Sequence, residues 1–304
     1  MKRNNFNTSL LVMCVVATFS FFQGKALGAD FELKINLNKK DYLTSEAIYV
    51  DTYFYNNTSH NVEINDWDPA FNINYIVKDA GGTIYNYETV HEDHYPAKRL
   101  TNLIKANSYY FEARNIVAHW GKGIGFLNPT SRFIPVGDYT VKVAFAYGAA
   151  VLTSNEENFS VHAPSGDEVN ARMLLSAAED SINSKNPSSS SNSAIILFDS
   201  LQKSYPKSYP KSMYRPMALH DIIYYCDLYL EDDKTASLYS KLLLDDYAQT
   251  DDAIFGFQMY TFIAKFKGVG SKNETEMIDY VFHNYPGTRV ELIAKQRKEV
   301  IEKK

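Results

Sequence analysis

The chain has very little cysteine: only Cys14 and Cys226 among 304 residues. Cys14 lies in an N-terminal apolar run, residues 10–22, which follows a basic start and precedes several small residues. This order is typical of a secretory signal peptide, with cleavage expected after Gly28; a retained N-terminal anchor is the alternative. Because only Cys226 then remains, no intramolecular disulfide is possible, and the mature domains must be stabilised by their apolar cores.

Long apolar runs and an excess of positive charge are also missing. No later stretch has the roughly 20 apolar residues that a membrane-spanning helix needs, so we expect no span after signal cleavage. Signal removal leaves 28 basic against 36 acidic side chains, a formal charge of −8. An acidic exported protein is a poor candidate for binding nucleic acid or anionic lipid. We expect it in the periplasm or at the surface of a bacterial cell.

Catalytic motifs are absent as well. The chain has no Gly-x-Ser-x-Gly motif, and "HWGKGIGF" (119–126) fits neither a phosphate-binding loop nor a dinucleotide fingerprint. Cys226 lies in an aromatic segment without a nearby base and is expected to be a buried small hydrophobe. His91 and His94 in "HEDHYP" are candidate metal ligands, but no third ligand lies nearby in the sequence. We therefore expect a protein that is not an enzyme and has no cofactor.

The first half of the chain has the pattern of β-strands. Apolar residues recur with a period of two from Asp30 to about Ala163, and the segments are separated by polar or glycine-containing turns. This pattern predicts a β-sandwich of seven to nine strands in a domain spanning residues 29–164. The segments expected to contain strands are 31–38, 47–57, 62–65, 71–79, 83–88, 107–117, 137–147 and 157–163.

Two of these stretches resemble a known family. "LNKKDYLTSEAIYVDTYFYNNTSHNVEIN" resembles the opening of many bacterial extracytoplasmic immunoglobulin-like domains. "VGDYTVKVAF" resembles the Gly-x-Tyr-x-Val strand that such domains carry near their end. The resemblance implies an immunoglobulin-like β-sandwich but says little about function, because this fold supports many roles. The Cys–Trp–Cys core of antibody domains is absent, so kinship to antibodies is not implied.

From residue 165 the apolar period changes from two to three and four, which predicts helices to the end of the chain. The chain is thus expected to be a multidomain β + α protein with a helical domain spanning residues 165–304. The expected helices are 165–183, 193–204, 213–230, 234–246, 251–267, 273–284 and 288–302.

The helical half also contains a repeated turn. "LQKSYPKS", "LLDDYAQT" and "FHNYPGTR" align on Tyr205, Tyr247 and Tyr285, which are 42 and 38 residues apart. Proline stops the preceding helix, because it cannot continue the hydrogen-bond ladder. We expect each tyrosine ring to wedge between helices with its hydroxyl in solvent. The next helix can be capped by Ser208, Thr250 or Thr288, respectively.

These segments resemble the second helix of tetratricopeptide-type repeats, although their period is near 40 rather than 34. The resemblance implies a solenoid of α-helical hairpins. The concave face of a solenoid commonly binds peptides, and tyrosine, of which the chain has 23, is enriched at interfaces. Packing between helices is the alternative for each candidate binding residue. The candidates are Tyr224, Tyr225, Tyr229, Tyr239 and Tyr260.

We therefore expect an exported, non-catalytic binding or scaffold protein of the cell envelope with a protein partner. One alternative is a carbohydrate-binding module that uses Trp67 in "INDWDP" or Trp120 in "HWGKGIGF". Another is a metal-dependent envelope enzyme or inhibitor that uses the loop at 91–94.

Overall fold

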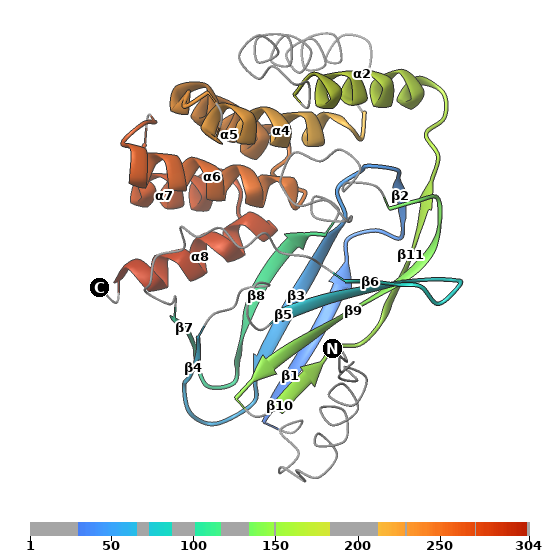
Figure 1. The fold of residues 1–304 in the computed structure, drawn as a ribbon. Helices are drawn as coiled ribbons and strands as arrows, with labels where there is room; N and C mark the ends of the chain where they lie inside the picture. Colours follow the sequence, from blue (N-terminus) through green and yellow to red (C-terminus); the bar gives the residue numbers. More distant parts are fainter. Residues whose placement is uncertain are drawn as a thin grey trace, which may run out of the picture.

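The structure is a computed structural model that describes the chain in eight stretches. A β region comes first, and a helical region with six described helices follows it (Figure 1). The predicted order of strands before helices is confirmed. The described stretches are residues 30–65, 73–86, 101–116, 134–148, 150–182, 212–228, 230–270 and 272–302.

The described strands are β1 (Phe31–Leu37), β2 (Asp41–Leu43), β3 (Tyr49–Asn56), β4 (Val62–Asn65), β5 (Ile73–Asp79), β6 (Ile84–Asn86), β7 (Thr101–Ile104), β8 (Ser108–Asn115), β9 (Gly137–Tyr147), β10 (Ala150–Thr153) and β11 (Glu157–His162). They form three sheets: β1–β3–β8, β2–β11–β9–β5–β6 with β10 also paired to β9, and β4–β7. Each of the eight predicted segments contains a strand. The short strands β2, β7 and β10 are not among the predicted segments.

The two larger sheets share one apolar cluster. Alternate residues of β1, from Phe31 to Leu37, are buried, as the period of two requires for one face of a strand. Phe54 of β3 meets Phe145 of β9 with ring centroids 5.5 Å apart. The inward side chains of both sheets therefore form the core of the β region.

A side-chain amide forms hydrogen bonds with the backbone of each edge strand of the β1–β3–β8 sheet. On β1, the Asn155 amide accepts a hydrogen bond from Ile35 N (2.9 Å) and donates one to Ile35 O (3.1 Å). On β8, the Gln296 amide, oriented to satisfy both partners, accepts from Phe111 N (2.7 Å) and donates to Phe111 O (2.9 Å). Unpaired strand edges invite pairing with other chains, so the two amides protect this sheet.

The six described helices are α2 (Asp167–Ile182), α4 (Arg215–Leu228), α5 (Asp233–Asp246), α6 (Asp252–Lys267), α7 (Glu274–Asn284) and α8 (Arg289–Glu302). Each begins and ends within about two residues of a predicted helix; the predicted helix at 193–204 lies outside the described residues. The helices pack in pairs, α4 on α5, α5 on α6 and α7 on α8. Within the described ranges, no helix is both long enough and apolar enough to cross a bilayer.

The predicted turn occurs twice in the described residues. Tyr247 ends α5 and donates its backbone N–H to Leu243 O, and Tyr285 ends α7 and donates its own to Val281 O. Three residues later, the hydroxyl of a threonine donates back to each tyrosine carbonyl, at 3.0 Å in the first turn and 2.6 Å in the second. The anchors at 247 and 285 therefore mark equivalent positions. Tyr205 and Ser208 lie outside the described residues.

The hydroxyl of the half-buried Tyr285 is hydrogen-bonded within the protein. It donates to Asp245 Oδ1 of α5 at 2.7 Å, and the Tyr280 hydroxyl donates to the same oxygen at 3.0 Å. The tyrosine is held by this carboxylate because α5 and α7 are neighbours at that point.

We expect Tyr285→Phe to lower the free energy of unfolding by about 1 kcal/mol, because one hydrogen bond to a carboxylate is lost. Tyr285→Ala should cost about 2 kcal/mol, because it also removes a half-buried ring. Urea unfolding measures both values, with Tyr109→Phe on the exposed Tyr109 as the matched control. Equal stability of wild type and Tyr285→Ala would contradict the prediction that the Tyr285 ring packs between helices.

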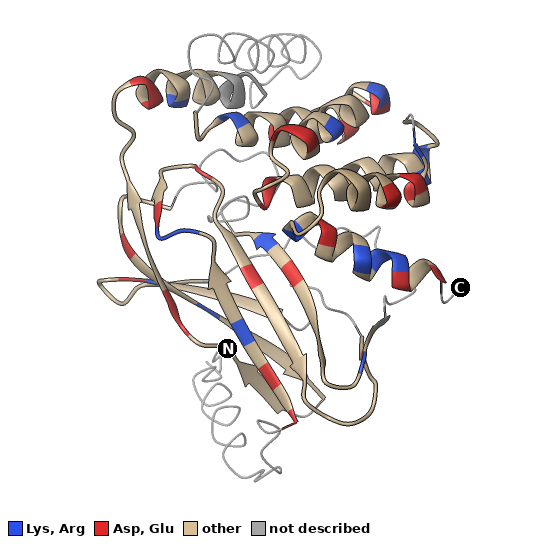
Figure 2. Cartoon of the chain, turned by 180° about the vertical axis from the view of Figure 1, so that it is seen from behind, with Lys and Arg blue, Asp and Glu red and all other residues tan. Residues whose placement is uncertain are grey.

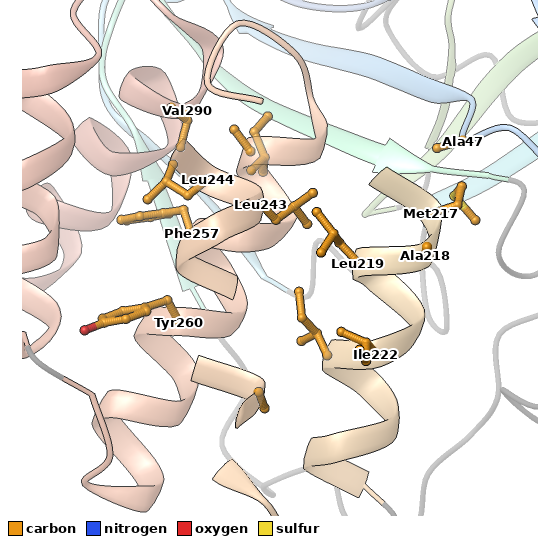
Figure 3. Packing of buried hydrophobic residues seen from close by; sticks show 14 of the residues in the cluster. Ala47, Met217, Ala218, Leu219, Ile222, Leu243, Leu244, Phe257, Tyr260 and Val290 are labelled. Atoms are coloured by element: carbon orange, nitrogen blue, oxygen red, sulfur yellow. The ribbon is translucent and has the colours of Figure 1, made fainter. Parts of the chain in front are cut away.

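The helical region docks on the outer face of the β1–β3–β8 sheet. Tyr49 and Phe111 of that sheet belong to the same apolar cluster as the helices. Ala47, in the loop before β3, lies next to Met217 and Ala218 of α4 (Figure 3). The apolar cluster of the helices therefore extends onto this sheet, separate from the core between the two sheets, which the sequence alone does not indicate.

Candidate functional site

The predicted tyrosine candidates lie in different environments. Tyr225 and Tyr260 are 3% and 2% exposed and pack in the core of the helical region. The Tyr260 hydroxyl accepts a hydrogen bond from Lys272 N at 3.0 Å. Tyr224 and Tyr239 are half-buried. Tyr224 borders the aromatic surface described below, through its contact with Phe255. Tyr229, Trp67, Trp120, His91 and His94 lie outside the described residues.

Cys226 is fully buried in α4. Burial, with smaller contributions from Asp232 and Asp227, raises the pKa of its thiol to about 12. The thiol is therefore neutral at physiological pH and packs as a small hydrophobe. Among the described residues, no group of three or more His, Cys, Asp or Glu side chains is arranged to hold a metal ion.

Helix α6 is apolar on almost its whole circumference. Phe257, Tyr260 and Ile263 are buried against the neighbouring helices. The other side carries four large apolar residues at spacings of four, three and four, which place them on one helical face. We name this set, together with the adjacent Tyr224 of α4, the α6 aromatic face; its α6 members are Phe255, Met259, Phe262 and Phe266.

The two ends of the α6 aromatic face differ: one end packs against α4, and the other is exposed to solvent. Phe255 stacks on His220 with centroids 4.0 Å apart and lies 4.9 Å from Tyr224. At the other end, Phe262 and Phe266 are in contact, with centroids 5.0 Å apart, and are 43% and 63% exposed. An exposed pair of phenylalanine rings on a folded helix marks a surface that gains stability when it is covered.

The sequence contained a signal for this face. Phe255, Met259, Phe262 and Phe266 have helical spacing in "AIFGFQMYTFIAKFK". Because the opposite side of the helix is equally apolar, the periodicity does not indicate which side is exposed. The preference for tyrosine over phenylalanine as an interface residue pointed to Tyr260, which lies on the buried side of α6.

A buried polar cluster joins β3 to α4 and α6. The Tyr49 hydroxyl lies 3.0 Å from His220 Nε2 and donates to Asp252 Oδ1 at 3.2 Å. Burial, followed by the charges of Asp252 and Asp251, raises the pKa of Tyr49 well above its usual value. Tyrosine, histidine and aspartate can exchange protons, but Tyr49 and His220 are 4% and 5% exposed. The cluster is therefore inaccessible to a substrate. Its hydrogen bonds link the β region to the helical region.

A second polar cluster at the interface has unbalanced charge. Arg289, at the start of α8, donates to Asp251 Oδ2 at 2.6 Å and lies 2.7 Å from Asp51 Oδ2. Asn38 also donates to Asp251 Oδ2, at 3.0 Å. We name Asp51 and Asp251 the interface carboxylate pair. Burial, followed by the charge of Asp251, raises the pKa of Asp51 to about 7, and burial also raises that of Asp251.

An open depression of about 580 Å³ lies at one end of the larger sheet, beside the turn at 79–82. Its rim carries charges of both signs, including Lys40, Lys78 and Asp138. Ser160 donates to Asp138 across it at 2.6 Å. Basic and acidic residues are interspersed along the described helices and strands in general (Figure 2). The depression therefore has no charge preference that would identify a ligand.

No protein-family model matches the chain, and no curated protein matches its sequence. Solved structures give only distant similarity. The alkylpurine DNA glycosylase AlkC of Pseudomonas fluorescens has 12% identity and a TM-score of 0.27 over 45% of this chain and 32% of that one. Spo0M, a sporulation control protein of Bacillus subtilis, has 13% identity and a TM-score of 0.26 over 50% and 55%. A β-glucosidase of Listeria innocua has 12% identity and a TM-score of 0.26 over 43% and 16%. Each match spans less than two thirds of the other protein, and none carries a functional argument.

Proposed function

We propose that the chain is an exported, non-catalytic binding protein of the bacterial cell envelope, and that its α6 aromatic face binds an apolar segment of a protein partner. The observation that carries this proposal is the exposure of Phe262 and Phe266 on α6, a helix whose other large apolar side chains are buried or half-buried. Large apolar side chains of a helix in a folded protein normally face the core. Large exposed aromatic surfaces commonly mark interaction sites, since covering them is favourable.

The proposed fold of the first region is an immunoglobulin-like β-sandwich. Two sheets share one core, and the Tyr139 hydroxyl at the start of β9 donates to Pro135 O at 2.8 Å. A tyrosine that bonds back to the chain just upstream is a feature of many such sandwiches. The Gly-x-Tyr-x-Val resemblance includes this residue.

For the second region we propose a tetratricopeptide-like solenoid of helical hairpins. It is supported by the two equivalent turns at Tyr247 and Tyr285 and by the packing of consecutive helices in pairs. In such an arrangement α4 and α6 are the first helices of successive hairpins, and α8 is the capping helix. The apolar cluster shared with the β region would present the α6 aromatic face in a fixed orientation, which favours binding because little order is lost.

The test uses the full-length mature protein with a photo-crosslinking amino acid at position 266, or at position 151 as a control. Val151 is 62% exposed on β10, in the other region. In the native envelope fraction, we expect position 266 to crosslink to a defined protein and position 151 not to. That protein, once purified, should bind the unmodified mature chain.

The double variant Phe262→Ser, Phe266→Ser should then weaken binding of the purified partner by about tenfold or more. Its melting temperature should stay close to that of wild type, because both rings are exposed. Val151→Ser is the matched control and should bind normally. Full binding by the double variant would refute the assignment of the face, and enzymatic turnover by the purified protein would refute a non-catalytic role.

A further inference from the structure

We propose that docking of the helical region on the β region is linked to proton binding: the interface carboxylate pair, Asp51 and Asp251, shares the single cation Arg289 and holds one proton when the regions are docked. The proposal concerns the interface between the regions and does not depend on what the α6 aromatic face binds. Asp51 belongs to β3, whereas Asp251 precedes α6 and Arg289 begins α8. Helix α8 lies beside β8, an edge strand of the sheet (Figure 1).

Both carboxylates are removed from water. The side chains of Asp51 and Asp251 are 0% exposed, whereas that of Arg289 is 29% exposed. Removing an ionised carboxylate from water is costly unless a cation and hydrogen-bond donors replace the solvent. One guanidinium between two carboxylates leaves a net negative charge if both are ionised.

The hydrogen bonds to the carboxylate oxygens of the pair are also too few. Asp251 Oδ2 has two donors, Arg289 and Asn38. Within the described residues, Asp51 Oδ1, Asp51 Oδ2 and Asp251 Oδ1 have no hydrogen-bond partner, and Asp51 Oδ2 has only the ion-pair contact with Arg289. A proton on one carboxyl removes the excess charge and turns an unsatisfied acceptor into a neutral group, which costs less to bury.

Among the described residues, the surrounding groups do not supply a second cation to the pair. Lys39, in the loop after β1, forms an ion pair with Glu46. Asp252 of α6 adds a negative charge next to Asp251, and the neighbouring His220 of α4 bonds to the Tyr49 hydroxyl. The other ionisable groups that face the pair are phenols, Tyr42 and Tyr53. The local field therefore favours proton uptake by the pair.

The sign of the linkage follows from the pKa of Asp51, which the interface raises from 3.8 to about 7. Between these values the folded chain holds a proton that the unfolded chain has released, so rising pH favours unfolding. The stability that this group contributes is present below about pH 4 and is lost progressively up to about pH 7. The upper limit of the effect is about 10³-fold in the unfolding equilibrium constant.

The first experiment measures proton release when the full-length mature protein is unfolded by urea at pH 5.5, followed with a pH indicator. We expect wild type to release up to one proton more than Asp51→Asn. Asp279→Asn, on α7 with a side chain that is 64% exposed, should match wild type. Equal release by wild type and Asp51→Asn would overturn the proposal.

The second experiment compares urea unfolding at pH 5 and pH 8. The unfolding constant of wild type should rise between these values by at least about tenfold more than that of Asp51→Asn. An Asp51→Asn protein that keeps the wild-type pH dependence would overturn the proposal. If Asp51→Asn does not fold, infrared spectroscopy of wild type decides: the band of a protonated buried carboxyl should disappear as pH rises through about 7, and absence of such a band refutes the proposal.

Discussion

Gly256→Ala is expected to lower the free energy of unfolding by about 2 kcal/mol, although alanine is the better helix former. Gly256 lies in the middle of α6 and is buried. A Cβ atom there would lie 2.7 Å from Ser240 O and 2.8 Å from Leu244 N, both in the backbone of α5. Since these atoms belong to a helix backbone, no side-chain rotation relieves the contact, and α5 and α6 must move apart.

The magnitude is the difference of two opposing effects. Gly→Ala inside a helix normally stabilises by about 0.5–1 kcal/mol, because glycine loses more backbone freedom on folding. Forcing extra volume into a packed interface costs about 1–3 kcal/mol and occasionally more. The contact here is with backbone, so we expect the upper part of that range and a melting temperature roughly 5 °C lower.

Urea and thermal unfolding measure the effect. Gln258→Ala is the matched control, because it lies on the same helix, is exposed, and should change stability by no more than about 0.5 kcal/mol. Gly256→Val should be worse than Gly256→Ala. A Gly256→Ala protein as stable as wild type would show that α5 and α6 do not approach this closely.

The same glycine explains why Tyr260, one of the predicted binding candidates, is buried. Gly256 marks the side of α6 that meets α5, and Tyr260, four residues later, lies on that side. Tyr260 is therefore buried, and Phe262 and Phe266 are left at the surface. A glycine within an apolar helix is a signal for close packing that the sequence contains, and it would have identified the inner side.

Helices were predicted well because their signals are local. Asn273 caps α7 by accepting from Glu276 N at 3.0 Å, while the Glu276 side chain accepts from Asn273 N at 2.8 Å. Gly268 ends α6 in the left-handed conformation, with a φ of 67°. Residues three or four apart are sufficient to specify such boundaries, so no knowledge of the tertiary structure is needed.

Contacts between distant parts of the chain could not be predicted. Strand β2 is three residues long and pairs in parallel with β11, with Asp41 opposite Ser160. Asp51 and Arg289 meet across the interface although more than 200 residues separate them. No periodicity or cap signals these pairings, which depend on how the two regions dock.

Asn56→Ala is expected to lower the free energy of unfolding by about 3 kcal/mol, a larger effect than that of Gly256→Ala. Asn56 ends β3 and is fully buried. Its Nδ2 donates to the carbonyls of His60 (2.9 Å), Lys105 (3.0 Å) and Ile104 (3.3 Å). Its Oδ1 accepts from the backbone N–H of Thr58 at 3.1 Å and from the Thr58 hydroxyl at 2.6 Å.

One side chain thus joins the turn after β3 to the turn between β7 and β8. Alanine would remove the Nδ2 donor from the buried Ile104 carbonyl and from the part-buried carbonyls of Lys105 and His60, and an unsatisfied buried group costs about 1–3 kcal/mol. Asn57→Ala is the matched control, because the adjacent Asn57 is exposed and its backbone bond to Asp30 O is kept.

Asn56→Asp separates shape from chemistry. Aspartate keeps the shape but, when ionised, places a charge against three carbonyl oxygens, so it should destabilise more than alanine at neutral pH. Because protonation restores one donor, this deficit should shrink as the pH falls towards 4. A stability of Asn56→Asp that is independent of pH would show that the carbonyl contacts do not hold the two turns together.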